Sequence, residues 1–147
     1  MLNRIFISSD IEGTCGIAHW DETELNKPDY EPFRQQMTAE VAAACEGAIA
    51  GGSDDIFVKD AHDSARNLIP AKLPESVQIF RGWGSDIHSM MSGIDSIFSG
   101  VIFTGYHSAS NTYANPLSHT MNTQNCSIRI NGIPTSEMVI NAFAAAH

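Results

Sequence analysis

Three short apolar runs, each followed at once by acidic or histidine side chains, constrain the fold of this chain most strongly. The runs occupy residues 5–9, 55–59 and 99–106. Their length, their content of Ile, Val and Phe, and their polar or glycine-rich ends are typical of buried strands. The side chains that follow are Asp10 and Glu12, then Asp60 and His62, and finally His107. Residues two apart in extended backbone point to the same side, so each pair can reach one place.

The segments between these runs predict helices and therefore an alternating α/β pattern. Apolar side chains recur at helical spacing over residues 30–50, and Gly51 and Gly52 supply a stop signal. Later elements are predicted as a strand at 77–80, a short helix at 87–94 and the long central strand at 97–104.

The last part of the chain predicts a hairpin followed by a helix. Asn131-Gly132 is a strong hairpin turn signal, and an Ala-rich helical segment begins at Ser136. Together the elements predict an α/β fold, an open three-layer sheet with helices on both faces and a metal site at the carboxyl ends of the strands. We expect residues 1–147 to form a single α/β metal-binding domain.

Charge and composition exclude several classes of function. The chain carries 17 acidic against 8 basic residues, a formal net charge of −9, with no Lys/Arg cluster, which disfavours nucleic acid as a partner. No apolar run reaches membrane-spanning length and no secretory signal is recognisable, so we expect a cytoplasmic protein with no membrane partner. Cys15, Cys45 and Cys126 fit neither a zinc ribbon nor a disulfide framework and are expected to be reduced thiols.

The mixture of carboxylates and imidazoles is typical of sites for zinc, manganese or cobalt. Asp10 and Glu12 can hold one ion with His62. A second oxygen of Asp10 can serve a neighbouring ion held by His107 and a further carboxylate, for which Glu137 is the best candidate.

Two neighbouring divalent ions suit amide hydrolysis, because they lower the pKa of a shared water and stabilise the oxyanion that forms. His119 follows a Pro-containing loop and can exchange a proton beside the ions.

Structural roles compete with these interpretations. Taken singly, Asp10 can be a turn cap, Glu12 a solvated loop acid, either ligand histidine a hydrogen-bonded structural residue, and Glu137 a first-turn acid of a helix. Asp60 is interpreted as orienting His62 or holding its loop rather than as a ligand. We interpret Asp63 as an ordinary surface residue, and Trp20 and Trp83 as residues that pack in the core or form the wall of a pocket.

Several segments that carry these candidates recur together in one order. They read SDIEGTCG at 9–16, KDAHDS at 59–64, TGYH at 104–107 and LSHTM at 117–121, followed by Asn131-Gly132, Glu137 and Asn141-Ala142. In this order, across nearly the whole chain, they resemble the zinc-dependent D-aminopeptidases of the DppA type.

The resemblance implies a dinuclear centre with two Zn²⁺ per subunit. In it Asp10 is shared, Glu12 and His62 complete one site, and His107 and Glu137 complete the other. It also implies ring-shaped homo-oligomers that release amino-terminal D-residues from short peptides.

Three further points follow from the resemblance. His119 matches the family's catalytic histidine. The resemblance leaves open whether this histidine acts as a nucleophile or as an acid–base group. We prefer a metal-activated water as the group that attacks the substrate. Lys59 stands where the family has a small polar residue. The family's chains continue beyond the position of His147, so we expect a truncated chain whose C-terminal half is separate or removed.

The sequence therefore predicts a metal-dependent aminopeptidase that hydrolyses the amino-terminal residue of short peptides, in particular D-amino-acid peptides. One alternative is a non-catalytic, metal-stabilised module that acts in assembly. Another is a metal-dependent hydrolase with a different amide or a phosphoester as substrate. No basic residue adjoins the candidate ligands, which favours amides over phosphoesters.

Overall fold

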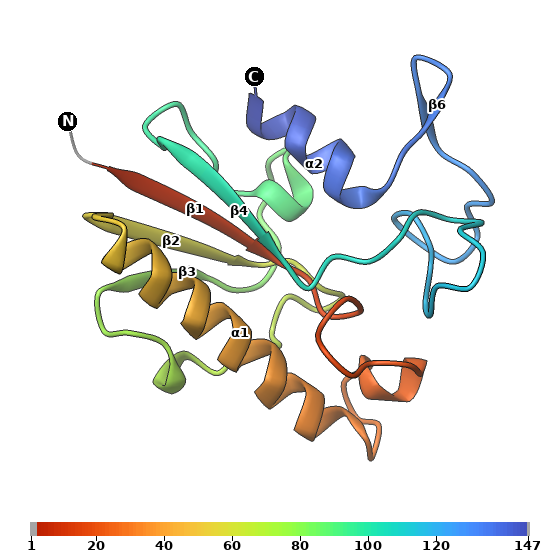
Figure 1. Ribbon diagram of the computed structural model, residues 1–147, viewed down its shortest axis with the longest axis horizontal. Coiled ribbons are helices and arrows are strands. Elements are labelled where there is room, and N and C mark those ends of the chain that lie inside the picture. Colours follow the sequence, from red (N-terminus) through yellow and green to blue (C-terminus); the bar gives the residue numbers. More distant parts are fainter. Residues whose placement is uncertain (1–2, 147) are drawn as a thin grey trace.

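The three apolar runs form three neighbouring strands of a parallel sheet. The computed structural model describes residues 3–146 and contains a four-stranded sheet in the order β3-β2-β1-β4 (Figure 1). Its strands are β1 (Arg4–Ser9), β2 (Asp55–Asp60), β3 (Val77–Phe80) and β4 (Gly100–Thr104). All pairings in this sheet are parallel, so the carboxyl ends of the strands share one edge.

The register of the sheet sets the level at which the site residues leave it. Ser9 at the end of β1 lies opposite Asp60 of β2 and Thr104 of β4. The segments that follow these three strands therefore start side by side.

Two local predictions are wrong. Residues 97–104 were expected as the long central strand, but β4 begins only at Gly100 and lies at the edge of the sheet, while β1 and β2 are the inner strands. The expected helix at 87–94 is reduced to a single 3-10 turn, η3 (Ser89–Met91). The positive φ angles of Ser89 (53°) and Gly93 (94°) explain this, because neither belongs to a right-handed helix.

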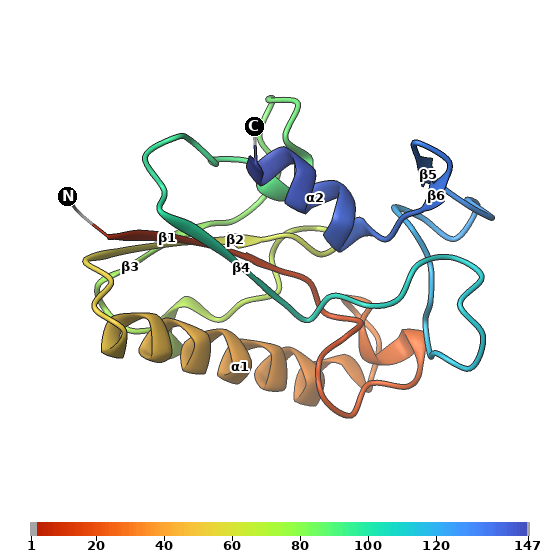
Figure 2. The same cartoon turned by 45° about the horizontal axis from the view of Figure 1, so that its top comes forward.

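Helices cover both faces of the sheet, which confirms the predicted three-layer α/β fold. Figure 2 shows α1 (Tyr30–Ala50) along one face and α2 (Glu137–Ala146) on the other. The apolar stripe of α1, including Met37, Val41 and Cys45, packs in one core cluster with Ile7 of β1 and Val58 of β2. Burial of this stripe fixes the helix against the inner strands.

The predicted hairpin is present and leads directly into α2. It pairs β5 (Arg129–Ile130) with β6 (Ile133–Pro134) in antiparallel fashion. Asn131 and Gly132 have φ angles of 52° and 81°, the positive values that a tight hairpin turn needs. The backbone N–H of Thr135 donates to the carbonyl of Ile128 at 2.9 Å, which places Glu137 at the first turn of α2.

Within residues 3–146, no helix combines the length and apolar character needed to cross a membrane. Cys15, Cys45 and Cys126 are free thiols, as expected. Burial raises the pKa of Cys45 to about 11, so this thiol stays protonated in the core.

Candidate metal centre

Two glycines allow the loops after β1 and β4 to meet at the carboxyl edge of the sheet. The backbone N–H of Gly13 donates to the carbonyl of Gly105 at 2.7 Å. A Cβ on Gly13 would collide with the carbonyl oxygen of Tyr106, and one on Gly105 with the carbonyl oxygen of Asp10. Gly105 also has a φ of +66°, which L side chains rarely adopt. Glycine at these positions therefore holds the segments of Asp10 and His107 together.

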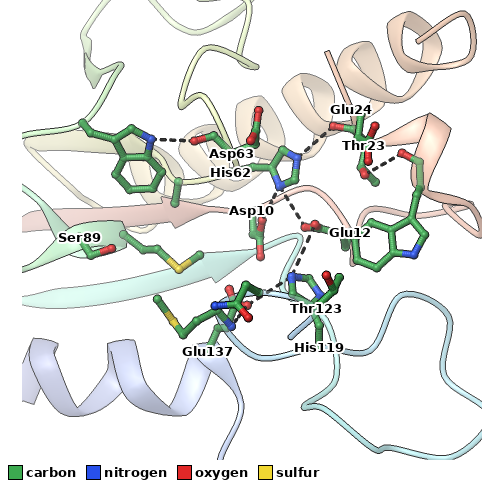
Figure 3. A pocket seen from close by; sticks show the side chains of 16 residues that line it. Asp10, Glu12, Thr23, Glu24, His62, Asp63, Ser89, His119, Thr123 and Glu137 are labelled. Carbon is green, nitrogen blue, oxygen red and sulfur yellow. Dashed lines mark hydrogen bonds and ion pairs between the residues drawn. The ribbon is translucent and has the colours of Figure 1, made fainter. Parts of the chain in front are cut away.

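The structure brings the six site residues predicted from the sequence into two adjoining groups of possible metal donors. The groups are Asp10, Glu12 and His62, and His107, His119 and Glu137. Donor atoms within a group lie within 4.8 Å of one another, and the six side chains are at most 12% exposed. Figure 3 shows the side chains of the first group pointing toward one another beside Glu137 and His119.

Asp10 connects the two groups. Its Oδ1 lies 3.3 Å from Nδ1 of His62, and its Oδ2 lies 3.5 Å from Nε2 of His107. Oε2 of Glu12 lies 3.1 Å from the same nitrogen of His62, and Oε1 of Glu137 lies 3.5 Å from the same nitrogen of His107. Each oxygen of Asp10 therefore faces a different imidazole, as a bridging carboxylate requires.

His119 adjoins both groups. Its Nε2 lies 3.4 Å from Oε1 of Glu137 and 3.8 Å from Oε1 of Glu12. The ring stacks on His107 with centroids 3.9 Å apart and an interplanar angle of 6°. The ring of Trp20 packs edge-on against the same ring at a centroid distance of 5.2 Å and an interplanar angle of 65°. These contacts hold the His119 ring with Nε2 toward the carboxylates.

A backbone carbonyl fixes one ring nitrogen of every imidazole in the site. The pairs are His62 Nε2 with Thr23 O at 3.0 Å, His107 Nδ1 with Ser108 O at 3.0 Å, and His119 Nδ1 with Leu117 O at 2.8 Å. A carbonyl oxygen only accepts, so the nitrogen that contacts it carries the proton. The opposite nitrogen of each neutral ring is then free to bind a cation or accept a proton.

The donor spacing fits a zinc site. Ligands at 2.0–2.1 Å from a tetrahedral zinc ion lie roughly 3.3 Å from one another, and five imidazole–carboxylate contacts of the site span 3.1–3.5 Å. Asp10 Oδ2, Glu12 Oε2 and His107 Nε2 are buried without a hydrogen-bond partner in the described part of the chain. Buried polar atoms of this kind are costly unless a cation satisfies them.

Burial and proximity shift the pKa values of these groups. Burial, with the nearby charge of Glu12, raises the pKa of Asp10 to about 7. Burial alone lowers an imidazole pKa, but the adjacent carboxylates of Asp10 and Glu12 outweigh it and raise the pKa of His62 to about 11. The adjacent carboxylates of Glu137 and Asp10 likewise outweigh burial and raise the pKa of His107 to about 9. Without a cation, protons therefore balance the carboxylates at neutral pH.

Asp60 and Lys59 lie close to the donors in sequence, but their side chains bind other groups. The Asp60 carboxylate accepts from the backbone N–H of Asn67 at 2.6 Å and holds the loop after β2, one of the two roles expected for it. Asn67 in turn donates from Nδ2 to the carbonyl of His62 at 2.7 Å. Lys59 is fully buried and donates from Nζ to the carbonyl of Gly82, away from the site.

A cavity of about 440 Å³ opens beside the donor groups. Its walls include Trp20 and Trp83, in agreement with their interpretation as pocket wall. Asp63 also lines it, although the sequence interpretation treated this residue as an ordinary surface acid. Its position directly after His62 was the available signal.

Thr23 is a site residue that the sequence interpretation missed. Its carbonyl, which follows the 3-10 turn η1 (Trp20–Glu22), accepts from His62 and fixes the orientation of that ring. A backbone carbonyl is the same in every residue, so no sequence signal marks this role.

Comparison with known proteins identifies the family. The sequence matches the family described as D-aminopeptidase, peptidase family M55, over residues 3–147. It is 30% identical over 146 residues to the D-aminopeptidase of Bacillus subtilis (strain 168), an alignment covering 98% of this chain and 52% of that protein. The structure of the Zn-dependent D-aminopeptidase DppA from Bacillus subtilis, a self-compartmentalizing protease, matches with a TM-score of 0.87 and 30% identity.

The structural match covers 97% of this chain and 51% of DppA, so the chain spans about half the length of the relatives it matches. The likeness covers nearly the whole chain, as the resemblance in the motifs predicted. Because the family match also extends over nearly every residue, this chain belongs to the M55 family of D-aminopeptidases.

Proposed function

We propose that this chain carries the dinuclear zinc centre of an aminopeptidase that removes the amino-terminal residue of short peptides, with a preference for D-residues. The observation that carries the proposal is the set of imidazole–carboxylate spacings of 3.1–3.5 Å around buried, unpartnered donor atoms of the described chain. Membership of the family supports it, and the D-preference rests on the family's description as D-aminopeptidases.

The residues assigned to the two ions are Asp10, Glu12 and His62 for one, and Asp10, His107 and Glu137 for the other. Backbone N–H groups orient two of these carboxylates, since Ile11 donates to Asp10 at 2.9 Å and Met121 donates to Glu137 at 2.5 Å. When bound, the paired zinc ions supply Lewis-acid chemistry, lowering the pKa of water and stabilising charge on the carbonyl oxygen under attack.

His119 is assigned the proton transfers of the reaction. The hydrogen bond between its Nδ1–H and the carbonyl of Leu117 leaves a lone pair on Nε2. Nε2 accepts a proton from the water that attacks the peptide carbonyl. As the carbon–nitrogen bond breaks, Nε2 returns that proton to the nitrogen of the leaving amine. Stacking on His107 and contact with Trp20 keep the ring in place for both transfers.

The charge of the cavity supports a substrate with a free amino group. Besides the donor groups, Glu24 and Asp63 line it, and no Lys or Arg of the described chain does. An acidic lining attracts an ammonium group and repels a phosphate. Peptide amides therefore fit this cavity better than phosphoesters.

We place this activity in a homo-oligomer. DppA is described as a self-compartmentalizing protease and has about twice the matched length. The half of DppA without a counterpart in these 147 residues is proposed to contribute to that assembly.

Zinc content and turnover test the proposal together. The zinc-loaded chain should bind two ions and release ammonia from D-Ala-amide faster than from L-Ala-amide. His119→Ala should keep both ions and lose at least about a hundredfold in kcat. His88→Ala is the matched control, because His88 is 42% exposed, pairs with Asp86 and lies outside the donor groups.

Two results would refute the proposal. A chain that takes up no zinc at neutral pH has no metal centre. A chain that binds two ions but hydrolyses neither amide supports a metal-stabilised assembly module instead.

A further inference from the structure

One wall of the cavity is an exposed tryptophan that is fixed in place. Trp83 is 46% exposed and lines the cavity that adjoins the donor groups. Its indole Nε1–H donates to the carbonyl of Asp63 at 2.7 Å. Asp63 directly follows the proposed ligand His62. The indole is therefore tied to the backbone one residue from the metal centre.

A buried lysine supports the same ring. Nζ of Lys59 lies 4.5 Å from the centroid of the Trp83 ring and 4.6 Å from that of Phe80. It donates to the carbonyl of Gly82, and within the residues that the structure describes it forms no ion pair. Cation–π attraction is strongest for a cation removed from water, as Lys59 is. Lys59 thus supports the Trp83 ring from inside the protein.

Other lining residues extend this apolar wall. Met90 is 5% exposed and Met121 is 43% exposed, and both line the cavity together with Trp20. Thioether side chains adapt their shape to aromatic and aliphatic partners. These apolar side chains give the otherwise acidic cavity a surface for an uncharged, apolar part of a ligand.

We propose that Trp83, held by Lys59 and the carbonyl of Asp63, is the specificity-determining wall for the side chain of the substrate's amino-terminal residue. It favours large apolar or aromatic side chains over alanine. The proposal rests on the aminopeptidase function proposed above. Because the indole is tied to the residue after His62, the substrate side chain nearest the hydrolysed carbonyl packs on it.

Hydrolysis of simple amino-acid amides tests this directly, since they have no second residue. Trp83→Ala should lower kcat/KM for D-Phe-amide roughly tenfold more than for D-Ala-amide, mainly through KM. Trp83→Phe should retain most of the preference. Lys59→Met, which keeps the length of the side chain and removes its charge, should reduce the preference to an intermediate value.

Matched controls separate this role from a general effect on folding. Zinc content should be the same in the Trp83 variants and the unaltered chain. Tyr113→Ala removes an aromatic ring that is 95% exposed and outside the cavity lining, and should leave the preference unchanged.

Direct binding gives a readout that does not depend on turnover. By calorimetry, D-phenylalanine should bind the zinc-loaded chain more tightly than D-alanine, and Trp83→Ala should abolish the difference. Equal binding of the two amino acids, or an equal loss for both amides in Trp83→Ala, would overturn the assignment of Trp83 while leaving the aminopeptidase proposal intact. Absence of hydrolysis with the binding preference intact would instead refute the proposed function alone.

Discussion

The two groups of metal donors are held by different kinds of structure. Asp10 and Glu12 lie one and three residues after the end of β1, and His62 lies two residues after the end of β2, so the parallel hydrogen-bond ladder sets their level. In the second group, His107 follows the end of β4 by three residues, whereas His119 and Glu137 lie in residues 108–137, where the regular elements are the short strands β5 and β6 and the start of α2 (Figure 1).

Hydrogen bonds between turns replace the ladder in this second region. Thr120 donates from Oγ1 to the carbonyl of Thr135 at 3.3 Å, and Asn125 donates from Nδ2 to the carbonyl of Thr120 at 3.0 Å. Leu117 and Met121, on either side of His119, have φ angles of 51° and 65°. Strand ends thus position the first group and the segment of His107, whereas turn contacts position His119 and Glu137, so the second group should be disturbed more easily.

The largest effect is expected where the two regions meet. Gly105→Ala should destabilise the chain by at least about 3 kcal/mol, because the added Cβ collides with the carbonyl of Asp10 at a positive φ. Urea unfolding measures this loss. Gly47→Ala in α1 is the control, since its Cβ meets nothing within 4 Å and should change stability by at most about 1 kcal/mol. A Gly105→Ala chain of normal stability would contradict the close crossing of the loops.

Zinc binding should separate the two groups next. His107→Ala removes a ligand of the loop-held group and should leave one tightly bound ion. His62→Ala should leave one ion bound at least about tenfold more weakly, since the remaining site depends on Glu137, which turn contacts position. Asp10→Asn should weaken both ions because Asp10 is shared. Competition with a zinc chelator measures each affinity, and equal affinities in the two histidine variants would contradict the comparison.

A smaller effect is expected from the buried link between the regions. The Tyr106 hydroxyl lies 2.7 Å from Oγ of Ser8 in β1 and accepts from Nδ2 of Asn141 in α2 at 3.1 Å. Tyr106→Phe leaves Asn141 without this partner and should cost about 1–3 kcal/mol in unfolding free energy. Tyr113→Phe, at a side chain 95% exposed, should have no effect. Equal unfolding free energies for the two variants would show that these hydrogen bonds do not stabilise the fold.

The smallest effect concerns pH in the metal-free chain. The pKa values of His62 and His107 are raised in the folded state, to about 11 and about 9, against about 6.5 when unfolded. Their protonation therefore stabilises the fold below about pH 6.5, and this contribution is lost as pH rises toward 9.

Urea unfolding of the metal-free chain between pH 6.5 and 9 should thus show stability falling with pH, and zinc uptake at pH 7.5 should release protons. Stability that rises over this interval in the metal-free chain would contradict the sign of the two shifts.

Local chemistry made much of this architecture predictable from the sequence. The strands, α1, the Asn131-Gly132 hairpin and the meeting of the six candidate residues follow from periodicity, turn residues and ordered motifs. The edge position of β4 did not follow, because strand order depends on long-range packing and the burial of residues 100–104 is intermediate throughout. Thr23 orients His62 through its backbone carbonyl, which no sequence pattern marks. The support of Trp83 by Lys59 did not follow either, because the two residues are 24 positions apart in the sequence.

The central claim is that two groups of donors at the carboxyl edge of the sheet share Asp10 around a pair of zinc ions. Anomalous diffraction at the zinc edge from crystals of the zinc-loaded chain tests it most directly. The account predicts two peaks about 2.0–2.1 Å from the donors, one beside Glu12 and His62, the other beside His107 and Glu137, with an oxygen of Asp10 bound to each. A single peak, or peaks that leave Asp10 unbound, would contradict it.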